Sequence, residues 1–168
     1  MEVSSSKNLD EEYNKNDVLS VSGNSGVVNQ IRFQGRSFAG KSVKNYSILR
    51  TNDVVYTKSP LKLNPYGIVK TNLGSTGIVS TLYAIYIPKS TLFSPFIQYY
   101  FDLDSKTNNY LRPLVNKGAK NDMKVRNDDV LKGQVIFPHE VDEQKHIVVL
   151  LNKLENAIAA NERTKKIA

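Results

Sequence analysis

The sequence predicts a mixed α/β (α+β) domain, with a mixed β-sheet and short helices, followed by a long C-terminal helix able to pair with another helix. Segments rich in β-branched and aromatic residues alternate with turn-forming segments. A Ser-Pro pair begins an amphipathic segment in the middle of the chain. After Pro138, helical periodicity continues with neither glycine nor proline. The length of 168 residues suits one domain with an appended element.

The expected strands share short runs of valine, isoleucine and aromatic residues bounded by turn formers. Val18–Val21, a Ser-Gly-Asn-Ser-Gly turn and Val27–Val28 predict a hairpin. The remaining expected strands are Asp53–Tyr56, Ile78–Ile87, which Pro88 ends, and Val135–Phe137, which Pro138 ends.

Two segments predict helices. Ser94 and Pro95 suit the N-cap and first helical positions, so a helix is expected near residues 95–105. In the last segment an apolar stripe repeats at spacings of four, three and four residues, which is typical of a helix–helix seam. The stripe residues are Ile147, Leu151, Leu154 and Ile158. The predicted division is therefore a domain over residues 1–138 and the start of a dimerisation or spacer helix over residues 139–168.

The positive charge is concentrated in one part of the chain. The net charge is +7, and residues 31–70 hold eight basic residues against Asp53 alone. Aromatic residues are interleaved with these cations, a composition that favours contact with a phosphate backbone. The alternative is that the lysines only solubilise the surface. The residues expected to contact DNA, including a second basic segment near residue 120, are Arg36, Lys41, Lys44, Tyr46, Lys58, Ser59, Lys62, Lys70, Lys117, Lys120, Asn121 and Lys124.

The sequence contains few of the residues and motifs that catalysis usually requires. The chain contains no cysteine and only two histidines, which argues against thiolate or multi-histidine metal sites. Neither a glycine-rich loop for S-adenosylmethionine nor a Gly-x-Ser-x-Gly nucleophile motif is visible. The pairs Asp102/Asp104 and Asp128/Asp129 leave a small metal-dependent nuclease as a minor alternative. With no signal peptide and no apolar run long enough to span a bilayer, a cytoplasmic location is expected.

The order of the segments is similar to that of a known family. Leu19–Ser22 and Gly26–Val28 are followed by Leu49–Lys58, then by the aromatic helical segment Pro95–Leu103 and by Gly118 in a polar loop. Val130–Pro138 comes next, and then Glu143-Gln144 before the apolar stripe. In this order the chain resembles one half of the DNA-specificity (S) subunit of type I restriction-modification systems. The half consists of one target recognition domain and the start of its spacer helix.

The resemblance implies a non-catalytic role. Such a subunit reads one half-site of a bipartite double-stranded DNA target with each recognition domain, while its helices hold methyltransferase (modification) subunits and, through them, the restriction subunit. S-adenosylmethionine, ATP and magnesium are then expected only in the partner subunits, and this chain should need no cofactor. Pairing of the helix with a second copy would give a weak homodimer. The competing hypothesis is a protein-interaction module whose helix docks a partner and which has no specific DNA target.

Overall fold

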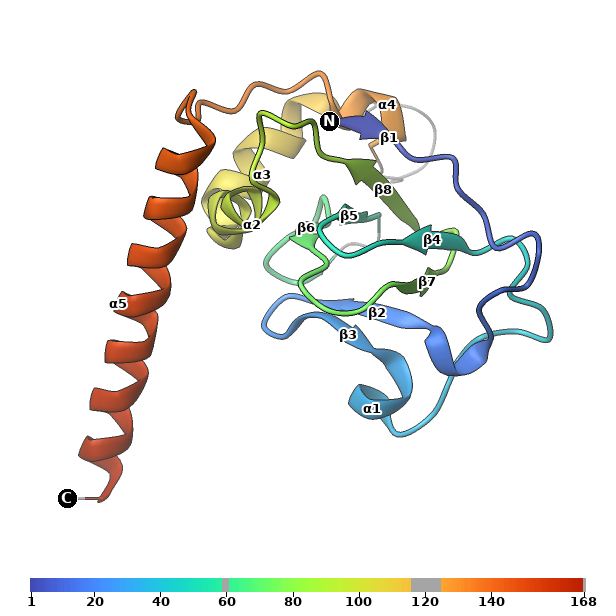
Figure 1. The fold of residues 1–168 in the computed structure, drawn as a ribbon, viewed down its shortest axis with the longest axis horizontal. Coiled ribbons are helices and arrows are strands. Elements are labelled where there is room, and N and C mark those ends of the chain that lie inside the picture. The colour runs from blue at the N-terminus through green and yellow to red at the C-terminus, as the bar shows by residue number, and fades with distance from the viewer. Residues whose placement is uncertain (59–60, 116–124, 168) are drawn as a thin grey trace.

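The computed structural model describes residues 1–58, 61–115 and 125–167, and its largest sheet has four strands (Figure 1). The strand order is β1-β8-β5-β6, and each neighbouring pair is antiparallel. The strands are β1 (Glu2–Val3), β5 (Val54–Thr57), β6 (Ile68–Thr71) and β8 (Tyr83–Ile87). The α+β fold class predicted from the sequence is confirmed.

Two small two-stranded sheets lie beside the four-stranded sheet. The first is the expected hairpin, in which β2 (Leu19–Ser22) pairs with β3 (Gly26–Asn29). The second pairs β4 (Ser47–Leu49) with β7 (Gly77–Val79). A parallel bridge between Val18 and Ile78 joins the two small sheets.

Strand β5 is buried along its whole length because both of its faces are covered. Side chains alternate across a strand, so Val54 and Tyr56 point to one face and Val55 to the other. Val54 and Tyr56 pack with Ile97 and Phe101 of the helical layer. Val55 packs in a second cluster that includes residues of both small sheets. The continuous apolar run at residues 54–56 thus lies between two layers, one made of helices and the other of the two small sheets.

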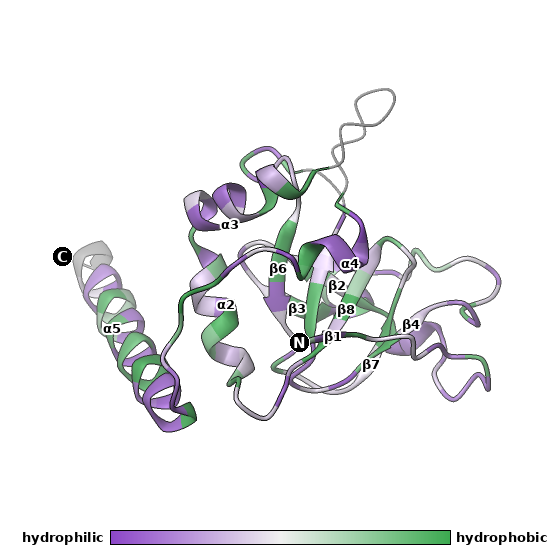
Figure 2. Cartoon of the chain, turned by 90° about the horizontal axis from the view of Figure 1, so that it is seen from above, coloured by the Kyte–Doolittle hydropathy of each residue, from purple (hydrophilic) through white to green (hydrophobic). Residues whose placement is uncertain are grey.

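The helical layer consists of α2 (Ser94–Asp102) and α3 (Asp104–Leu111), followed by the short helices η2 (Arg112–Leu114) and α4 (Asn127–Val130). Helix α2 lies against β6, and helix α5 (Val141–Ile167) lies against α2. Figure 2 shows α5 standing beside the domain with apolar and polar bands along its length. The second layer carries the two small sheets and the short helices η1 (Lys15–Asp17) and α1 (Gln30–Gln34).

A buried glutamine holds the start of α5 in place. The side chain of Gln144 is fully buried and makes three hydrogen bonds. Its Oε1 accepts from the Phe93 amide at 2.8 Å, and its Nε2 donates to the carbonyls of Thr91 at 3.0 Å and Pro138 at 2.9 Å. One turn later the buried Val148 adds an apolar contact surface. The direction in which α5 leaves the domain is therefore fixed by its first two turns.

The segment expected to be one strand over Ile78–Ile87 is two strands. A turn at residues 80–82 separates β7 from β8, and the Tyr83 amide donates to the Ser80 carbonyl at 3.2 Å. The two halves belong to different sheets, because β7 pairs with β4 whereas β8 pairs with β1 and β5. The apolar run itself cannot reveal this, since a strand that changes sheets stays apolar on both sides of the turn.

The helix expected near residues 95–105 ends at Asp102, and α3 begins two residues later. Leu103 between them is extended, with ψ of 114°, and its side chain is exposed. The Thr107 hydroxyl donates to the Phe101 carbonyl at 2.6 Å, so the break leaves that buried carbonyl with a partner. The N-cap is Phe93, and Ser94 is the first helical residue.

The strand expected at Val135–Phe137 is wrong. No strand pairing includes these residues in the part of the chain that the structure describes. Val135 packs against the core, whereas Ile136 is 93% exposed. The edge of the sheet beside β8 is occupied by β1, so the segment crosses the molecule without a ladder partner. Among the described helices, none is long and apolar enough to cross a membrane.

We predict that replacing Thr107 by valine lowers the free energy of unfolding by about 1–3 kcal/mol. The shape of the side chain is retained, but the buried Phe101 carbonyl loses its donor. The matched control is Thr164→Val, which removes an exposed hydroxyl that donates to Ala160 along α5; its effect should stay within about 0.5 kcal/mol. Equal denaturant midpoints for the wild type and Thr107→Val would contradict this account of the break.

Candidate nucleic-acid interface

Helix α1 is short because both of its ends are specified by the sequence. Asn29 Oδ1 accepts from the Arg32 amide at 3.1 Å and caps the first turn. Gly35 follows the last turn with φ of 78°, a left-handed conformation that favours glycine, and its amide donates to the Ile31 carbonyl at 2.8 Å. Five residues therefore form one exposed turn, which presents Arg32 and Phe33.

Gln30 fixes the loop that follows α1. Its Nε2 donates to Ser20 Oγ on β2 at 3.1 Å, and its Oε1 accepts from the Phe38 amide at 2.7 Å. Ser37 Oγ also donates to the same Oε1 at 3.5 Å. One glutamine side chain thus connects a buried strand position to an exposed loop, and the loop from Gly35 onward is held at a defined place beside α1.

Three exposed cations and two exposed phenylalanines of α1 and this loop form what we call the α1 surface: Arg32, Phe33, Arg36, Phe38 and Lys41. Residues 29–46 contain four basic residues and no acidic residue. Arg32 and Lys41 make no ion pair with the described residues, and Arg36 Cζ lies 4.6 Å from the centroid of the Phe38 ring. The two phenylalanines are about half exposed. Cations and exposed aromatic rings on one surface are the groups that bind phosphates and bases.

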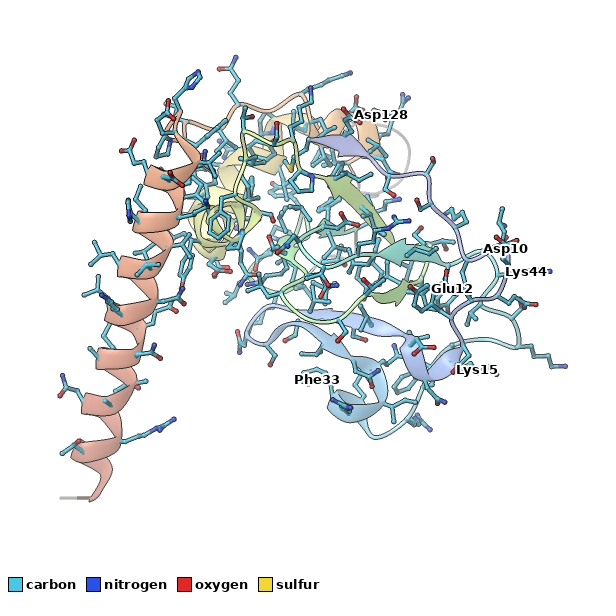
Figure 3. All side chains as sticks on the ribbon, viewed as in Figure 1. Asp10, Glu12, Lys15, Phe33, Lys44 and Asp128 are labelled. Atoms are coloured by element: carbon cyan, nitrogen blue, oxygen red, sulfur yellow. The ribbon has the colours of Figure 1, made fainter. Side chains whose placement is uncertain are left out.

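The fourth cation of this segment, Lys44, lies beside acidic residues. Its Nζ is 3.8 Å from Glu11 Oε2, and both side chains are more than half exposed. Figure 3 shows Lys44 at the same end of the molecule as Asp10 and Glu12. An exposed ion pair of this kind contributes little to stability, but it lowers the local positive potential. The other three cations of the segment, Arg32, Arg36 and Lys41, make no ion pair with the described residues.

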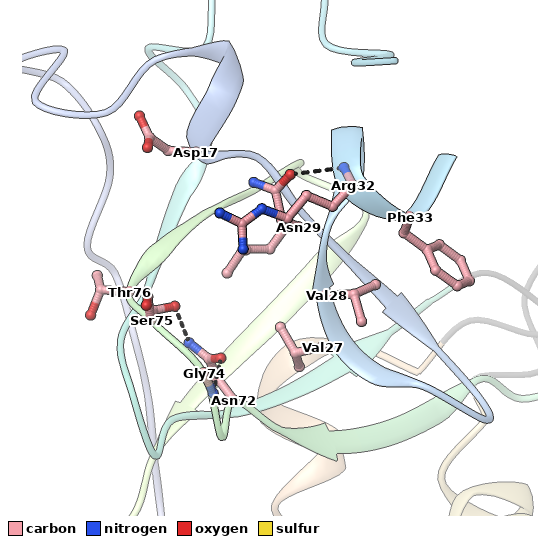
Figure 4. A pocket seen from close by; sticks show the side chains of 11 residues that line it. Asp17, Val27, Val28, Asn29, Arg32, Phe33, Asn72, Gly74, Ser75 and Thr76 are labelled. Carbon is pink, nitrogen blue, oxygen red and sulfur yellow. Dashed lines mark hydrogen bonds between the residues drawn. The ribbon is translucent and has the colours of Figure 1, made fainter. Parts of the chain in front are cut away.

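A hollow of about 570 Å³ opens beside α1 (Figure 4). One wall comes from the β2–β3 hairpin and α1, including Asn29, Arg32 and Phe33, and the other from the loop 72–76. Asn72 holds that loop, since its Nδ2 donates to the carbonyls of Leu49, Arg50 and Ser75. Asp17 also lines the hollow, so both hydrogen-bond donors and acceptors face it.

The structure divides the basic block predicted at residues 31–70. Arg36 and Lys41 lie on the α1 surface, with Lys44 at its edge. Lys62 lies in the loop after β5, which contacts the helical layer because Asn108 Nδ2 of α3 donates to the Leu63 carbonyl at 2.9 Å. Lys58 begins the same loop and is half-buried. The block is thus not one continuous surface, because consecutive parts of it lie in different layers.

One of the expected DNA contacts belongs to the interior, and a second is half-buried. Lys70 on β6 is buried, and its Nζ pairs with the Asp102 carboxylate of α2. Its ammonium joins the sheet to the helical layer, so the expectation of a surface contact is corrected for this residue. Tyr46 is half-buried and packs against the cluster of Val18, Val43 and Ile78. Ser59, Lys117, Lys120, Asn121 and Lys124 lie outside the described residues.

The stripe on α5 is only partly covered by the domain. Ile147 and Leu151 are half-buried, whereas Leu154 and Ile158 are 51% and 58% exposed. Leu150, which the expected stripe omitted, is also 58% exposed. Between residues 144 and 155 the helix turns a different side to the domain, through Gln144, Val148 and the contacts of Tyr99. An apolar stripe therefore remains open to a partner.

Tyr99 provides the outermost contact between α2 and α5. Its hydroxyl oxygen lies 2.7 Å from Asn152 Oδ1 and 3.0 Å from Glu155 Oε2, so it can donate to one of the two acceptors at a time. Burial, followed by the hydrogen bond to Glu155, raises the pKa of Tyr99 to about 12. The hydroxyl consequently stays protonated at neutral pH and continues to donate.

Two of the four aspartates considered for a nuclease, Asp102 and Asp129, form ion pairs. Asp102 pairs with Lys70, and Asp129 pairs with Lys132 at 2.6 Å and with Arg126 at 3.8 Å. Within the described ranges, no group of three or more acidic, histidine or cysteine residues is arranged to hold a metal ion. Both histidines, His139 and His146, are exposed.

Arg32, Phe33 and Phe38 are the residues of the α1 surface that the sequence-based site omitted. The signal that could have found them is local: an asparagine N-cap and a glycine six residues later bracket one helical turn.

No family model matches this sequence, and neither does any curated protein. The resemblance based on segment order therefore stays a hypothesis, and the chemistry of the surfaces has to support a function.

We predict that Gln30→Leu releases the loop after α1 without unfolding the domain. The leucine fills a similar volume but cannot accept from the Phe38 amide, so hydrogen exchange of that amide should become faster. Global stability should fall by about 0.5–1.5 kcal/mol. Gln34→Leu is the matched control, because Gln34 is exposed on the same helix and makes no hydrogen bond through its side chain to the described residues. Unchanged exchange at Phe38 in the Gln30 variant would show that Gln30 does not fix the loop.

Proposed function

We propose that this chain is a non-catalytic DNA recognition module that binds double-stranded DNA through the α1 surface. The observation that carries the proposal is the segment 29–46, which has four basic and no acidic residues and is held on the β2–β3 hairpin by Gln30. Cations on a fixed surface can align with successive phosphates, whereas cations on independent loops lose more conformational entropy on binding.

The chemistry available at this surface suits both parts of DNA recognition. Arg32 and Lys41 supply charge that can neutralise phosphates. The hollow beside α1 presents Arg32, Asp17 and the loop 72–76, whose donors and acceptors are of the kind that contact base edges. The net charge of +7 adds long-range attraction that would speed association with DNA.

In this proposal α5 is the helix that binds other protein chains. Its exposed stripe, Leu150, Leu154 and Ile158, extends beyond the part of the helix that the domain covers. Following the resemblance to a half specificity subunit, the stripe would pair with a counterpart helix and help to dock type I methyltransferase subunits in the cytoplasm. Methyl transfer and cleavage, with S-adenosylmethionine, ATP and magnesium, would belong to those partners. A homodimer through the same stripe would be weak, because Asn161 follows Ile158 at the next seam position.

One observation favours the second candidate, a protein-interaction module without a DNA target. The stripe on α5 is the largest linear set of exposed aliphatic side chains on one described helix, and exposed sets of this kind mark protein partners. The two candidates differ in what the α1 surface does. A pure interaction module leaves the α1 surface without a ligand, so DNA binding by the purified chain separates them.

We predict that duplex DNA binding weakens steeply with salt and depends on the α1 surface. Changing Arg32, Arg36 and Lys41 together to glutamate should reduce the slope of log K against log salt by about 0.9 for each of these cations that contacts a phosphate. Fluorescence anisotropy with duplexes between 50 and 200 mM salt (a range of about fourfold) measures both affinity and slope.

The control for this experiment changes the same total charge elsewhere. Lys89, Lys106 and Lys153 are exposed outside the α1 surface, and their joint replacement by glutamate lowers the net charge equally. This control should retain most of the salt slope. Equal losses in the two variants would mean that total charge, and not the α1 surface, determines binding.

A second prediction concerns the α5 stripe. Leu154→Asp with Ile158→Asp should abolish self-association and recruitment of methyltransferase subunits while DNA affinity per chain stays the same, because both side chains are exposed and remote from the domain core. Sedimentation at several concentrations measures the association. Asn156→Asp with Ala159→Asp adds the same charge to another side of the helix and should change neither property. A strict monomer in the wild type that also fails to bind any partner would contradict a docking role.

A further inference from the structure

Arg36 differs from the other cations of the α1 surface in how its head group is held. Its guanidinium lies over the ring of Phe38, with Cζ 4.6 Å from the ring centroid. A guanidinium is planar and weakly hydrated, and it stacks on an aromatic face without using its N–H groups. No hydrogen bond or ion pair joins Arg36 to the described residues, so its in-plane N–H edge stays open to a ligand.

The ring that supports Arg36 is itself held from the protein interior. The Phe38 amide donates to Gln30 Oε1 at 2.7 Å, and Gln30 Nε2 donates to Ser20 Oγ at 3.1 Å. Ser20 is buried on β2. The left-handed Gly35 turns the chain out of α1 immediately before Arg36. A continuous series of contacts therefore leads from a buried strand to an exposed guanidinium.

Lys41 on the same loop lacks every element of this arrangement. It is exposed, and it makes no hydrogen bond, ion pair or ring contact with the described residues. A lysine ammonium on a mobile stem is a point charge that meets phosphates with little directional demand. A pre-oriented guanidinium fork instead matches two acceptors in one plane, and less side-chain freedom is lost when it binds.

We infer that Arg36 is the specificity-determining residue of the α1 surface and that it reads a guanine in the major groove. This inference rests on the DNA-binding function proposed above. Guanine presents the O6 and N7 acceptors side by side in the major groove, and the arginine fork can donate to both. Phe38 acts as a positioning residue, because it holds the guanidinium plane and makes no contact with the base in this arrangement.

The test begins with selection of bound duplexes from a randomised pool by the wild-type chain. We expect a guanine at one position of the selected site. Replacing that guanine by adenine should weaken binding on the order of 10- to 100-fold, and replacing it by 7-deazaguanine, which lacks the N7 acceptor, should also weaken binding. The same duplexes are then measured with Arg36→Lys, Arg36→Ala, Phe38→Leu and Lys41→Ala.

The variants separate base reading from charge. Arg36→Lys keeps the charge, and we expect it to lose the guanine preference at that one position as Arg36→Ala does. Phe38→Leu alone should reduce the guanine preference. Added to Arg36→Lys, it should have no further effect on that preference. Lys41→Ala should weaken binding to all sequences alike. Folding of each variant is checked by its thermal unfolding transition. Because all three substituted side chains are exposed, the unfolding temperature should stay that of the wild type.

Retention of the guanine preference in Arg36→Ala overturns the inference and leaves DNA binding itself intact. The same conclusion follows if the selected site contains no guanine whose replacement matters. Absence of salt-dependent binding to any duplex by the wild type overturns the proposed function, and the inference with it. The two failures are therefore distinguishable in one set of measurements.

Discussion

The burial of β5 on both faces is the constraint on which the rest of the structure depends. Val54 and Tyr56 complete the core under the helices, while Val55 completes the core under the small sheets. Each fully buried aliphatic side chain contributes about 1.5–3 kcal/mol, so neither layer can leave β5 without exposing its own core. The hydroxyl of Tyr56 adds a polar contact, since it lies within hydrogen-bond reach of the Tyr66 carbonyl at 2.5 Å. Burial raises the pKa of that hydroxyl to about 12 and keeps it a donor.

This division gives each layer its own surface. The helical layer carries α5, which is fixed by Gln144 and Tyr99, and the other layer carries the α1 surface, which is fixed by Gln30. In both places a neutral side chain with directional hydrogen bonds holds the exposed element. A ligand of the α1 surface and a partner of the α5 stripe can therefore be bound by the same chain without competing for residues. That arrangement suits the proposed DNA recognition module, in which one surface reads DNA and the other joins subunits.

Much of the fold could be predicted from the sequence, because local patterns set the hairpin at residues 19–29, the apolar strand at residues 54–57 and the long C-terminal helix. The errors arose where contacts between distant segments decide the secondary structure. Residues 78–87 change sheets at a turn, Leu103 interrupts a helix whose periodicity continues, and Val135–Phe137 finds no strand to pair with. The candidate site followed the same rule. The charge pattern drew attention to residues 31–70, but Lys70 pairs with Asp102 in the interior, and only the folded chain brings Gln30 to Phe38. Charge along a sequence does not say which side of a strand a lysine occupies.

Hydrogen exchange of the whole chain with and without duplex DNA tests the central claim most directly, since it reports where DNA lies without altering any residue. The amides of residues 30–46 should gain protection in the presence of DNA at low salt and lose it again at high salt. The amides of α5 from residue 150 onward should be unaffected, because that part of the helix contains none of the residues of the α1 surface. Protection confined to α5 or to the α2–α3 layer, with residues 30–46 unchanged, would contradict the assignment of the α1 surface as the DNA-binding face.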